Sequence, residues 1–304
     1  MGPPRETCPP SNWMCCRGAG LINRELAVGR RAPAGASPRP EAERWRRPAA
    51  RAPRRLDQWL AAHALEIKPK TLQDYRHLIN RHVKPRIGEL RLQAVRPAQI
   101  SKLYRELVST GGRGETGLSP RTVEYVHAVL RKAFRDAVVV DQLLVSNPVE
   151  RAKRPRNPVR ERGEVWTSAQ LRAFLEQARG HRLFAFYHLA AYTGARRGEL
   201  LNLRWRDVDL TAHEVCITGS AAVVGGARIE GTTKTGRLRT VSIDTGTVQV
   251  LREHRSRQAA EQLAVGIDWR GTDDYVFSTG WGEPVHPDTV SSLMADLIRS
   301  HNEA

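Results

Sequence analysis

Apolar residues recur at helical spacing along most of this chain, but its first 55 residues show no such period. Between Leu56 and about Glu150 the spacing predicts four helices, each with one apolar and one polar face. The residues predicted to face inward are, helix by helix, Leu56, Trp59, Leu60 and His63; Leu72, Tyr75, Ile79 and His82; Ile100, Leu103, Tyr104 and Leu107; and Val123, Val126, Leu130, Phe134 and Ala137. This pattern is typical of a bundle of helices with one shared core.

Local signals predict where two of these helices begin and end. Thr71 and Asp74 have the spacing of a capping box at the start of the second helix, and Pro85 with Gly88 is expected to end it. Ser119 is expected to cap the fourth helix. The outer face of that helix is basic and carries Arg121, Arg131, Lys132 and Arg135.

A second group of elements begins near Glu164 and mixes helical with strand-like segments. Thr167 and Gln170 form another capping box, and helices are predicted from there to Leu175, over 183–192, after 196, over 247–263 and from Pro287 onward. Residues 213–219, 227–231 and 239–243 read as short strands of one small antiparallel sheet. The chain is therefore predicted to be mainly α with a small antiparallel β-sheet.

Two stretches lack either pattern. Residues 1–55 are rich in Pro, Gly, Ala and Arg, so we expect them to be disordered; a basic arm on DNA and an upstream or out-of-frame reading of GC-rich sequence both fit them. Residues 151–163 form a basic, proline-bearing linker, which suits either contact with phosphates or a solvated hinge. The predicted organisation is a disordered segment over 1–55, a helical domain over 56–150, the linker, and a second domain over 164–304.

The formal net charge of the chain is +17. Such a charge attracts polyanions, of which nucleic acid is a common one. Codon bias is the competing explanation, because 42 of the 49 basic residues are Arg, whose codons are GC-rich. The charge favours a nucleic-acid partner but leaves both explanations open.

The cysteines and the apolar segments exclude several classes. Cys8, Cys15, Cys16 and Cys216 are too scattered for a disulfide framework or a zinc site. No apolar run is long enough to cross a bilayer, and the N-terminus has no basic segment followed by an apolar stretch. We expect a cytoplasmic protein with no membrane partner, associated with the nucleoid where it binds DNA.

The most specific pattern in the chain is Thr193-Gly194-Ala195-Arg196-Arg197-Gly198-Glu199-Leu200-Leu201. An apolar helix ends in a Thr-Gly turn, an arginine follows at once, and a glutamate stands three residues later. This run resembles the first active-site box of the tyrosine recombinases, the phage integrase family. The resemblance covers roughly residues 56–300 and implies a helical, SAM-like core-binding domain followed by an α+β catalytic domain. The reaction it implies is site-specific breakage and rejoining of double-stranded DNA through a 3′-phosphotyrosine, with no metal or nucleotide cofactor.

Two residues of this box have roles that the resemblance implies. Arg196 corresponds to the arginine that grips the scissile phosphate, and a guanidinium suits that role because it stays charged and offers paired donors to two phosphate oxygens. Glu199 lies one helical turn further on and is expected to orient neighbouring basic side chains. The alternative for Glu199 is an ordinary salt bridge within a helix.

Lys234 is the other catalytic candidate. It stands in Thr232-Thr233-Lys234-Thr235-Gly236-Arg237, between two predicted strands. This stretch resembles the family's β-hairpin lysine, which protonates the leaving 5′ oxygen, and an ammonium beside a phosphate can act as a general acid. The alternative is a solvated lysine without a role.

The remaining part of the family's pattern is not found. The family next requires a His-x-x-Arg box, a further His or Trp and a nucleophilic Tyr, and the chain ends some residues short of that segment. His254 and Arg257 have the right spacing, but they come one element too early, on what is predicted to be an exposed helical face. Tyr275, the last of six tyrosines, is expected to lie in the core. We therefore expect an incomplete, C-terminally truncated catalytic domain that forms no covalent intermediate alone.

The predicted function is DNA binding by a member of the integrase lineage of a mobile element, with other integrase protomers as possible partners on the DNA. The alternatives are a non-catalytic regulator that interferes with a full-length integrase and a nonfunctional remnant of a mobile element. The residues expected to contact DNA outside the box are Lys70, Thr71, Arg76, Arg121, Arg131, Arg135, Arg154 and Arg156.

Overall fold

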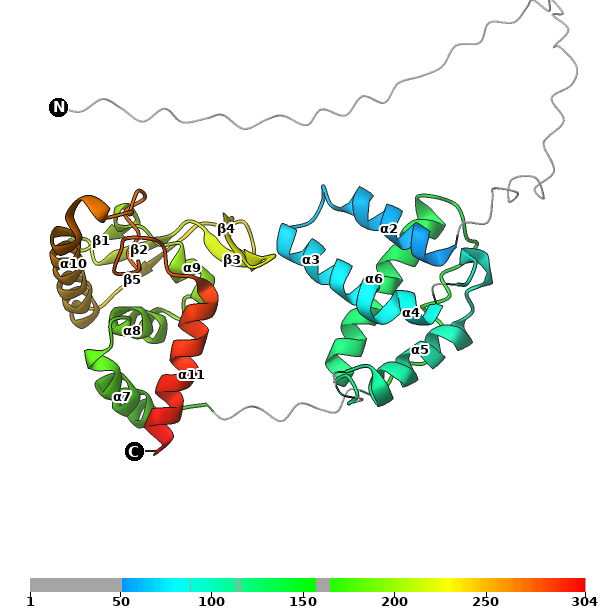
Figure 1. Ribbon diagram of the computed structural model, residues 1–304, viewed down its shortest axis with the longest axis horizontal. Helices are drawn as coiled ribbons and strands as arrows, with labels where there is room; N and C mark the ends of the chain where they lie inside the picture. Colours follow the sequence, from blue (N-terminus) through cyan, green and yellow to red (C-terminus); the bar gives the residue numbers. More distant parts are fainter. Residues whose placement is uncertain (1–50, 88, 113, 115, 157–164, 304) are drawn as a thin grey trace, which may run out of the picture. The chain divides into compact units, whose positions relative to one another are not determined.

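The computed structural model describes residues 51–87, 89–112, 114, 116–156 and 165–303, which form two groups of elements, each around its own hydrophobic core (Figure 1). The interpretations given above for residues 1–50 and for residues 157–163 of the linker lie outside these ranges. Helix α2 (Ala52–His63) begins four residues before its predicted start. The reason is Pro53, which stands in the first turn of the helix, where a proline is favoured because its missing N–H is not needed.

The first group consists of helices alone in the described residues. After α2 come α3 (Pro69–Leu78), a π-helical turn (Ile79–Val83), α4 (Lys84–Ile87), a short 3₁₀ helix (Leu92–Ala94), α5 (Pro97–Thr110) and α6 (Pro120–Val139). The inward faces predicted from the sequence form its core, where only Leu72 and Tyr75 among the predicted residues are half-buried and the others are buried. Ser119 caps α6 as predicted, since its Oγ accepts a hydrogen bond from the backbone N–H of Thr122 at 3.2 Å.

The second helix differs from its prediction at both ends, although its helical run does stop at Ile87, within the predicted Pro85–Gly88 signal. Pro85 does not end the second helix, because a π-helical turn joins α3 to α4 and the N–H of Lys84 bonds to the carbonyl of Ile79, five residues back. The change of hydrogen-bond pattern just before Pro85 accommodates a residue that lacks an N–H. Thr71 does not cap this helix, which begins at Pro69. Asp74 instead forms an ion pair with Lys70 (Nζ–Oδ1 3.0 Å).

The second group combines helices with short strands. In chain order its elements are α7 (Ser168–Gln177), a 3₁₀ turn (Ala178–Gly180), α8 (Phe184–Thr193), α9 (Arg197–Leu201), a 3₁₀ turn (Trp205–Asp207), β1 (Val208–Asp209), β2 (Glu214–Ile217), β3 (Ser220–Val224), β4 (Ala227–Gly231), β5 (Arg239–Ser242), α10 (Thr245–Val265), a 3₁₀ turn (Gly266–Asp268) and α11 (Pro287–Glu303). The capping box of Thr167 and Gln170 opens α7 as predicted. Pro287 begins α11, also as predicted.

The strands form two sheets in place of the single sheet predicted. One is antiparallel with the order β1-β2-β5, and Val215 of β2 lies opposite Val241 of β5. The other is the separate hairpin β3-β4, whose first strand was not predicted. Its turn is Gly225-Gly226, and both glycines have positive φ, 60° and 83°. A Gly-Gly pair between two strands is a strong hairpin signal, and it was overlooked because Ser220–Val224 shows no alternation of polar and apolar residues.

Helix α8 forms the centre of the second core. Half of its ten residues are buried, and it packs against α7 and α10. Val276 and Phe277, from the apolar segment predicted over 275–277, are at most 1% exposed. Leu293, Met294 and Leu297 of α11 are only partly buried against this core. The described residues thus match the predicted class, mainly α with small antiparallel sheets.

Candidate functional site

Arg196 stands at the point where α8 ends and α9 begins. Gly194 ends α8 in the left-handed conformation (φ 61°), and the N–H of Ala195 donates to Thr193 Oγ1 at 3.2 Å. Arg196 is the N-cap residue of α9, and its side chain is 61% exposed. The Thr-Gly turn therefore places a charged guanidinium on the surface at a helix start, as the sequence predicts.

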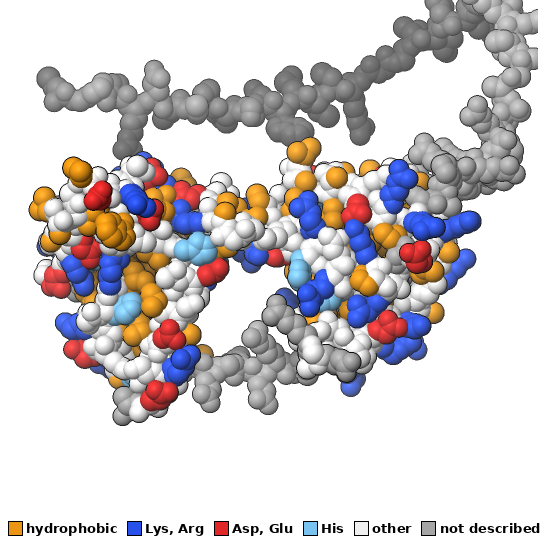
Figure 2. Space-filling view, viewed as in Figure 1, with side chains coloured by type: hydrophobic (Ala, Val, Ile, Leu, Met, Phe, Trp, Pro, Cys, Tyr) orange, Lys and Arg blue, Asp and Glu red, His pale blue; other side chains and the backbone are white. Residues whose placement is uncertain are grey.

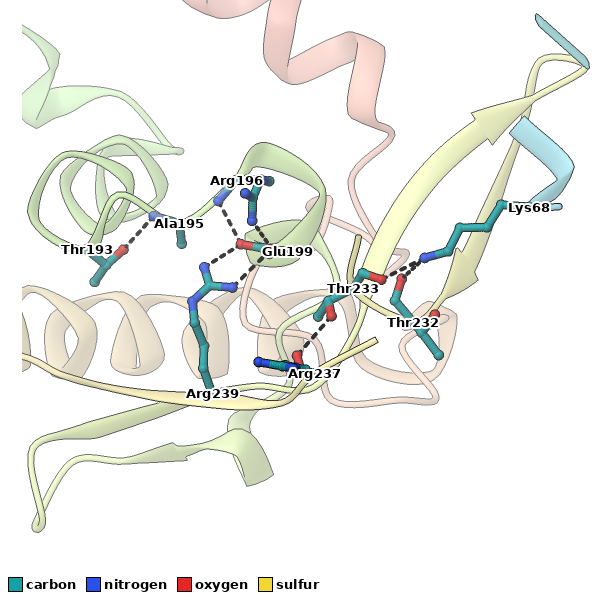
Figure 3. Close-up of polar contacts among 9 residues, drawn as sticks. All are labelled: Lys68, Thr193, Ala195, Arg196, Glu199, Thr232, Thr233, Arg237 and Arg239. Carbon is teal, nitrogen blue, oxygen red and sulfur yellow. Dashed lines mark hydrogen bonds and ion pairs between the residues drawn. The ribbon is translucent and has the colours of Figure 1, made fainter. Parts of the chain in front are cut away.

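Glu199 is a buried carboxylate that two arginines surround (Figure 3). Its side chain is 1% exposed. Oε1 accepts from the Nη1 atoms of Arg196 (3.0 Å) and Arg239 (3.2 Å), and Oε2 accepts from Nη2 of Arg239 (2.6 Å) and the backbone N–H of Arg196 (3.0 Å). Both carboxylate oxygens are therefore fully used inside the protein.

The electrostatics of this cluster favour an anion. The hydrogen bond from Arg239 and those from Arg196 lower the pKa of Glu199 to about 2, against the opposing effect of burial, and the bond to Glu199 raises the pKa of Arg239. Two guanidiniums share one carboxylate, so the cluster keeps one net positive charge. Since the side chains of Arg196 and Arg239 are 61% and 38% exposed, their remaining donors can bind an anion from solution.

Arg239 is a residue of this cluster that the sequence analysis did not identify. Residues 239–243 were read only as a strand, and β5 does place Arg239 opposite Ile217 of β2. A buried carboxylate needs charged partners, so a second arginine would have been sought if the burial of Glu199 had been known. That burial depends on contacts distant in sequence, and no local signal reveals it.

Lys234 lies in a tight turn on the surface. The N–H of Gly236 (φ 72°) donates to the carbonyl of Thr233 at 3.1 Å, and Thr233 Oγ1 donates to the carbonyl of Arg237 at 2.9 Å. Thr233 is 2% exposed, so the base of the turn is buried while the Lys234 side chain is exposed. Lys234 lies between β4 and β5, as predicted, but these strands belong to different sheets and do not form a hairpin. Arg239 follows five residues later.

Gly198 allows α9 to lie directly on the β3-β4 hairpin. A Cβ atom at this position would stand 2.4 Å from the carbonyl oxygen of Ala221 and 2.6 Å from Ser220 Oγ. Because these distances are below any van der Waals contact, only glycine fits without movement. The glycine of the box therefore fixes the distance between α9, which carries Arg196 and Glu199, and the hairpin that leads to Lys234.

His254 is not on an exposed face, so that prediction was wrong. It is 4% exposed, and its Nε2 is 2.7 Å from the carbonyl oxygen of Val276, to which it donates. Burial lowers the pKa of His254. The helical face was misjudged because α10 has almost no apolar stripe in its sequence, and the segment that covers it lies 22 residues away. His254 is a core histidine.

Tyr275 is buried, as predicted, and is 7% exposed. Its hydroxyl donates to Oε1 of Glu230 at 2.5 Å. Across the described part of the chain, which includes all six tyrosines, none forms a hydrogen bond with Arg196, Glu199 or Arg239.

The other predicted contact residues lie on the first group and on the start of the linker. Thr71 is half-buried, and the basic side chains are exposed. Three of these are paired, Lys70 with Asp74, Arg121 with Glu124 and Arg131 with Glu150. The rest, which form no ion pair within the described ranges, are Arg76, Arg135, Arg154 and Arg156.

The excess of positive charge is unevenly distributed. Residues 51–156 hold 22 Lys and Arg against 10 Asp and Glu, whereas residues 165–303 hold 16 of each kind. Figure 2 shows basic side chains spread over the face of α2–α6, with few acidic ones between them. Residues 165–303 have no net charge, so the positive cluster around Glu199 is local.

Among the described residues, no group of His, Cys, Asp and Glu side chains has an arrangement that could hold a metal ion. No described helix is long and apolar enough to cross a membrane.

Comparisons with known proteins cover both groups of elements. Residues 54–108 match the family model described as phage integrase, N-terminal SAM-like domain, and residues 164–303 match the model described as phage integrase family. The chain is 28% identical over 230 residues to the ICEBs1 integrase of Bacillus subtilis (strain 168), which covers 74% of this chain and 60% of the relative. It is also 28% identical over 251 residues to an integrase of Streptomyces ambofaciens, with coverage of 81% and 62%. The chain spans about three fifths of the length of these curated relatives.

Solved structures share the fold. The integrase of the Tn1549 transposon, in complex with transposon right end DNA, has a TM-score of 0.70 at 17% identity, covering 84% of this chain and 79% of that chain. A lambda integrase dimer bound to a COC′ core site has a TM-score of 0.60 at 18% identity, covering 83% and 82%.

Proposed function

The chain belongs to the phage integrase family, and on this premise we propose that these 304 residues bind double-stranded DNA as a site-specific tyrosine recombinase does. In this proposal, Arg196 binds a phosphate of the cleavage site. The observation that carries the proposal is the buried Glu199, which holds two partly exposed guanidiniums and leaves them one net positive charge. The Tn1549 and lambda integrases were solved bound to DNA, the lambda enzyme as a dimer. We propose that this chain likewise binds DNA, together with other protomers on the same DNA.

The chemistry of the proposed site follows from its donors. A phosphodiester carries one negative charge on two oxygens, and the paired N–H groups of a guanidinium match two oxygens at once. Arg196 neutralises that charge, and Glu199 holds its guanidinium in place. Lys234, on the turn between β4 and β5, is the proposed general acid that donates a proton to the departing 5′ oxygen.

The first group of elements supplies the affinity in this proposal. Its 22 basic residues against 10 acidic ones suit contact with the DNA backbone, which carries one negative charge per phosphate. We propose that residues 56–150 act as the core-binding domain, that 151–163 link it to the catalytic domain of 164–304, and that the four unpaired arginines Arg76, Arg135, Arg154 and Arg156 touch phosphates. A transposon integrase among the structural relatives supports a mobile element as the origin of the DNA site.

The covalent step needs a nucleophile that these 304 residues do not place at the cluster. Formation of a 3′-phosphotyrosine requires a tyrosine oxygen that attacks the phosphorus held by Arg196. The Tyr275 hydroxyl donates to Glu230, and within the described ranges no tyrosine bonds to Arg196, Glu199 or Arg239. We propose that these residues bind DNA and do not cut it alone.

A binding experiment tests the phosphate site. Arg196→Ala should weaken binding of a labelled duplex, measured by fluorescence anisotropy, about 10- to 100-fold, which corresponds to the loss of one bidentate charged contact. Arg179→Ala is the matched control, because it removes the same charge from an exposed ion pair with Glu176 and should change the affinity less than about threefold. Equal effects of the two substitutions would contradict the proposed site.

A second experiment tests the catalytic roles. Joining the C-terminal segment of a relative, such as the ICEBs1 integrase, to these residues should restore a covalent adduct on a nicked suicide duplex, detected by denaturing electrophoresis. The same chimera with Arg196→Ala or Lys234→Ala should form much less adduct. A soluble, DNA-binding chimera without any adduct would contradict the catalytic roles and favour a DNA-binding regulator.

A further inference from the structure

Four side chains form a charged cluster at β4, the strand that leads to the turn holding Lys234. Tyr275 donates its hydroxyl to Oε1 of Glu230 at 2.5 Å. Nη2 of Arg204 donates to Oε2 of Glu230 at 2.7 Å and to the Tyr275 hydroxyl at 3.1 Å. Nη1 of Arg228 is 2.7 Å from Oε1 of Glu230. The cluster therefore joins β4, which carries Arg228 and Glu230, to two segments distant in sequence.

The tyrosine ring is also held by cation–π contacts. The guanidinium carbons of Arg204 and Arg228 lie 4.6 Å and 4.9 Å from its centre. At these distances the electron-rich faces of an aromatic ring attract cations. The ring and the hydroxyl of Tyr275 thus act on the same two arginines that hold Glu230.

Burial makes this cluster costly. The side chains of Arg204 and Arg228 are each 12% exposed, and the Nε atoms of both are buried without a partner in the described structure. Burial raises the pKa of Glu230, but the hydrogen bonds from Tyr275, Arg204 and Arg228 lower it below its ordinary value overall. Two cations and one anion leave one positive charge unbalanced. The two arginines are mostly buried while the side chain of Glu230 is 30% exposed, and ion pairs with buried partners often stabilise a fold less than apolar residues would.

The hairpin that the cluster holds has almost no core of its own, and its C-terminal end is also held by Lys68, whose Nζ donates to the carbonyls of Thr232 (2.9 Å) and Thr233 (2.6 Å). Of the residues in β3 and β4, only Ala221 is buried. A two-stranded hairpin without an apolar face is marginally stable by itself. On one side, close packing at Gly198 brings α9 onto β3. On the other strand, Arg228 donates from Nη2 to the carbonyl of Leu201, the last residue of α9, at 2.9 Å.

We propose that Tyr275, Glu230, Arg204 and Arg228 are positioning residues that fix the direction in which β4 leaves the core, and so fix Lys234 relative to Arg196. Lys234 follows Glu230 by four residues, and its turn begins at the buried Thr233. Arg196 caps the start of α9 and Leu201 ends that helix. Through Arg228 the cluster therefore holds both α9, next to Arg196, and β4, the strand that leads to Lys234. The inference builds on the role proposed for Lys234.

NMR of Lys234 tests the positioning directly. The protein has seven lysines, so ¹³C-labelled lysine should give seven signals. The signal that disappears in Lys234→Ala is that of Lys234. Tyr275→Phe removes only the hydroxyl and keeps the ring. It should shift or broaden the signals of Lys234 and of Lys68, whose Nζ bonds to the carbonyls of Thr232 and Thr233 in the same turn, while the other five stay in place. Tyr187→Phe is the matched control, because the Tyr187 hydroxyl is buried without a hydrogen-bond partner in the described structure. An unchanged Lys234 signal in both Tyr275→Phe and Glu230→Gln would overturn the inference.

A double-mutant cycle on DNA affinity separates positioning from stability. Tyr275→Phe should weaken duplex binding about threefold in the parent and leave it unchanged when Lys234 is already Ala, since coupled residues are not additive. In an Arg76→Ala background the threefold effect should persist. Equal effects in both backgrounds would overturn the inference. If Lys234→Ala itself leaves the affinity and the chimera's adduct unchanged, the proposed role of Lys234 fails, and the NMR result still decides the positioning.

Discussion

Replacing Glu199 by Gln should destabilise the second group of elements by about 3 kcal/mol at neutral pH. The substitution keeps the size of the side chain but removes the charge that two arginines share. The pKa of Glu199 falls from its ordinary value of 4.5 to about 2 in the folded protein. A shift of about 2.5 units corresponds to about 3 kcal/mol of stabilisation by the ionised form, since each unit is worth about 1.4 kcal/mol.

The effect should depend on pH in a defined direction. Because the folded-state pKa is depressed, the stabilisation is complete well above pH 4.5 and is lost as the pH falls toward 2. At pH 3 the unfolded carboxylate is protonated while most of the folded one is still ionised. The difference between the parent and Glu199→Gln should therefore shrink from about 3 kcal/mol at pH 7 to about 1 kcal/mol at pH 3.

Urea unfolding followed by ¹⁹F NMR of fluorotryptophan can measure this difference. Trp205 is buried in the second core and Trp59 in the first, so one titration reports on each group separately. Glu199→Gln should lower the midpoint for Trp205 and leave that for Trp59 in place. Glu176→Gln is the control: it also removes a carboxylate from an i,i+3 pair with Arg, but both partners are more than two-thirds exposed. A loss below 1 kcal/mol at pH 7, or the same loss at pH 3, would refute the reasoning.

Two further substitutions probe the neighbourhood of the site. Gly198→Ala should lower the melting temperature in calorimetry and weaken duplex binding in anisotropy, since its Cβ would lie 2.4 Å from the carbonyl oxygen of Ala221. Gly180→Ala is the control and should change neither quantity, because nothing lies within 4 Å of a Cβ at that position. His254→Ala should destabilise the second group by about 2–4 kcal/mol in the same urea titration, as the loss of a large buried side chain does, but leave DNA affinity unchanged. A loss of affinity in a fully folded His254→Ala protein would contradict the assignment of His254 as a core histidine without a role in binding.

The sequence predicted the features that depend on neighbours a few residues apart. The inward face of α6 follows from a period of 3.6 residues, and the caps at Ser119 and Thr167 follow from hydrogen bonds that span three residues. The Thr-Gly turn likewise placed Arg196 at a helix start, because Gly194 must adopt a left-handed conformation that glycine tolerates best.

The features that were missed depend on residues distant in sequence. Arg239 reaches Glu199 across 40 residues, and the carbonyl that covers His254 belongs to Val276. Pairing of β2 with β5 passes over the whole β3-β4 hairpin, so adjacency along the chain suggested one sheet where there are two. Local patterns carry no information on such pairings, because each depends on the packing of the complete fold.

The central claim, that Arg196 holds a DNA phosphate, is tested most directly by the salt dependence of binding. The logarithm of the dissociation constant for a duplex is measured against the logarithm of the KCl concentration for the parent and for Arg196→Ala. Each phosphate contact adds about 0.9 to the slope through counterion release. The parent should show a steep slope, since residues 51–156 carry 22 basic and 10 acidic side chains, and Arg196→Ala should reduce it by about 0.9. Identical slopes for the two proteins, or binding that does not respond to salt, would contradict the claim.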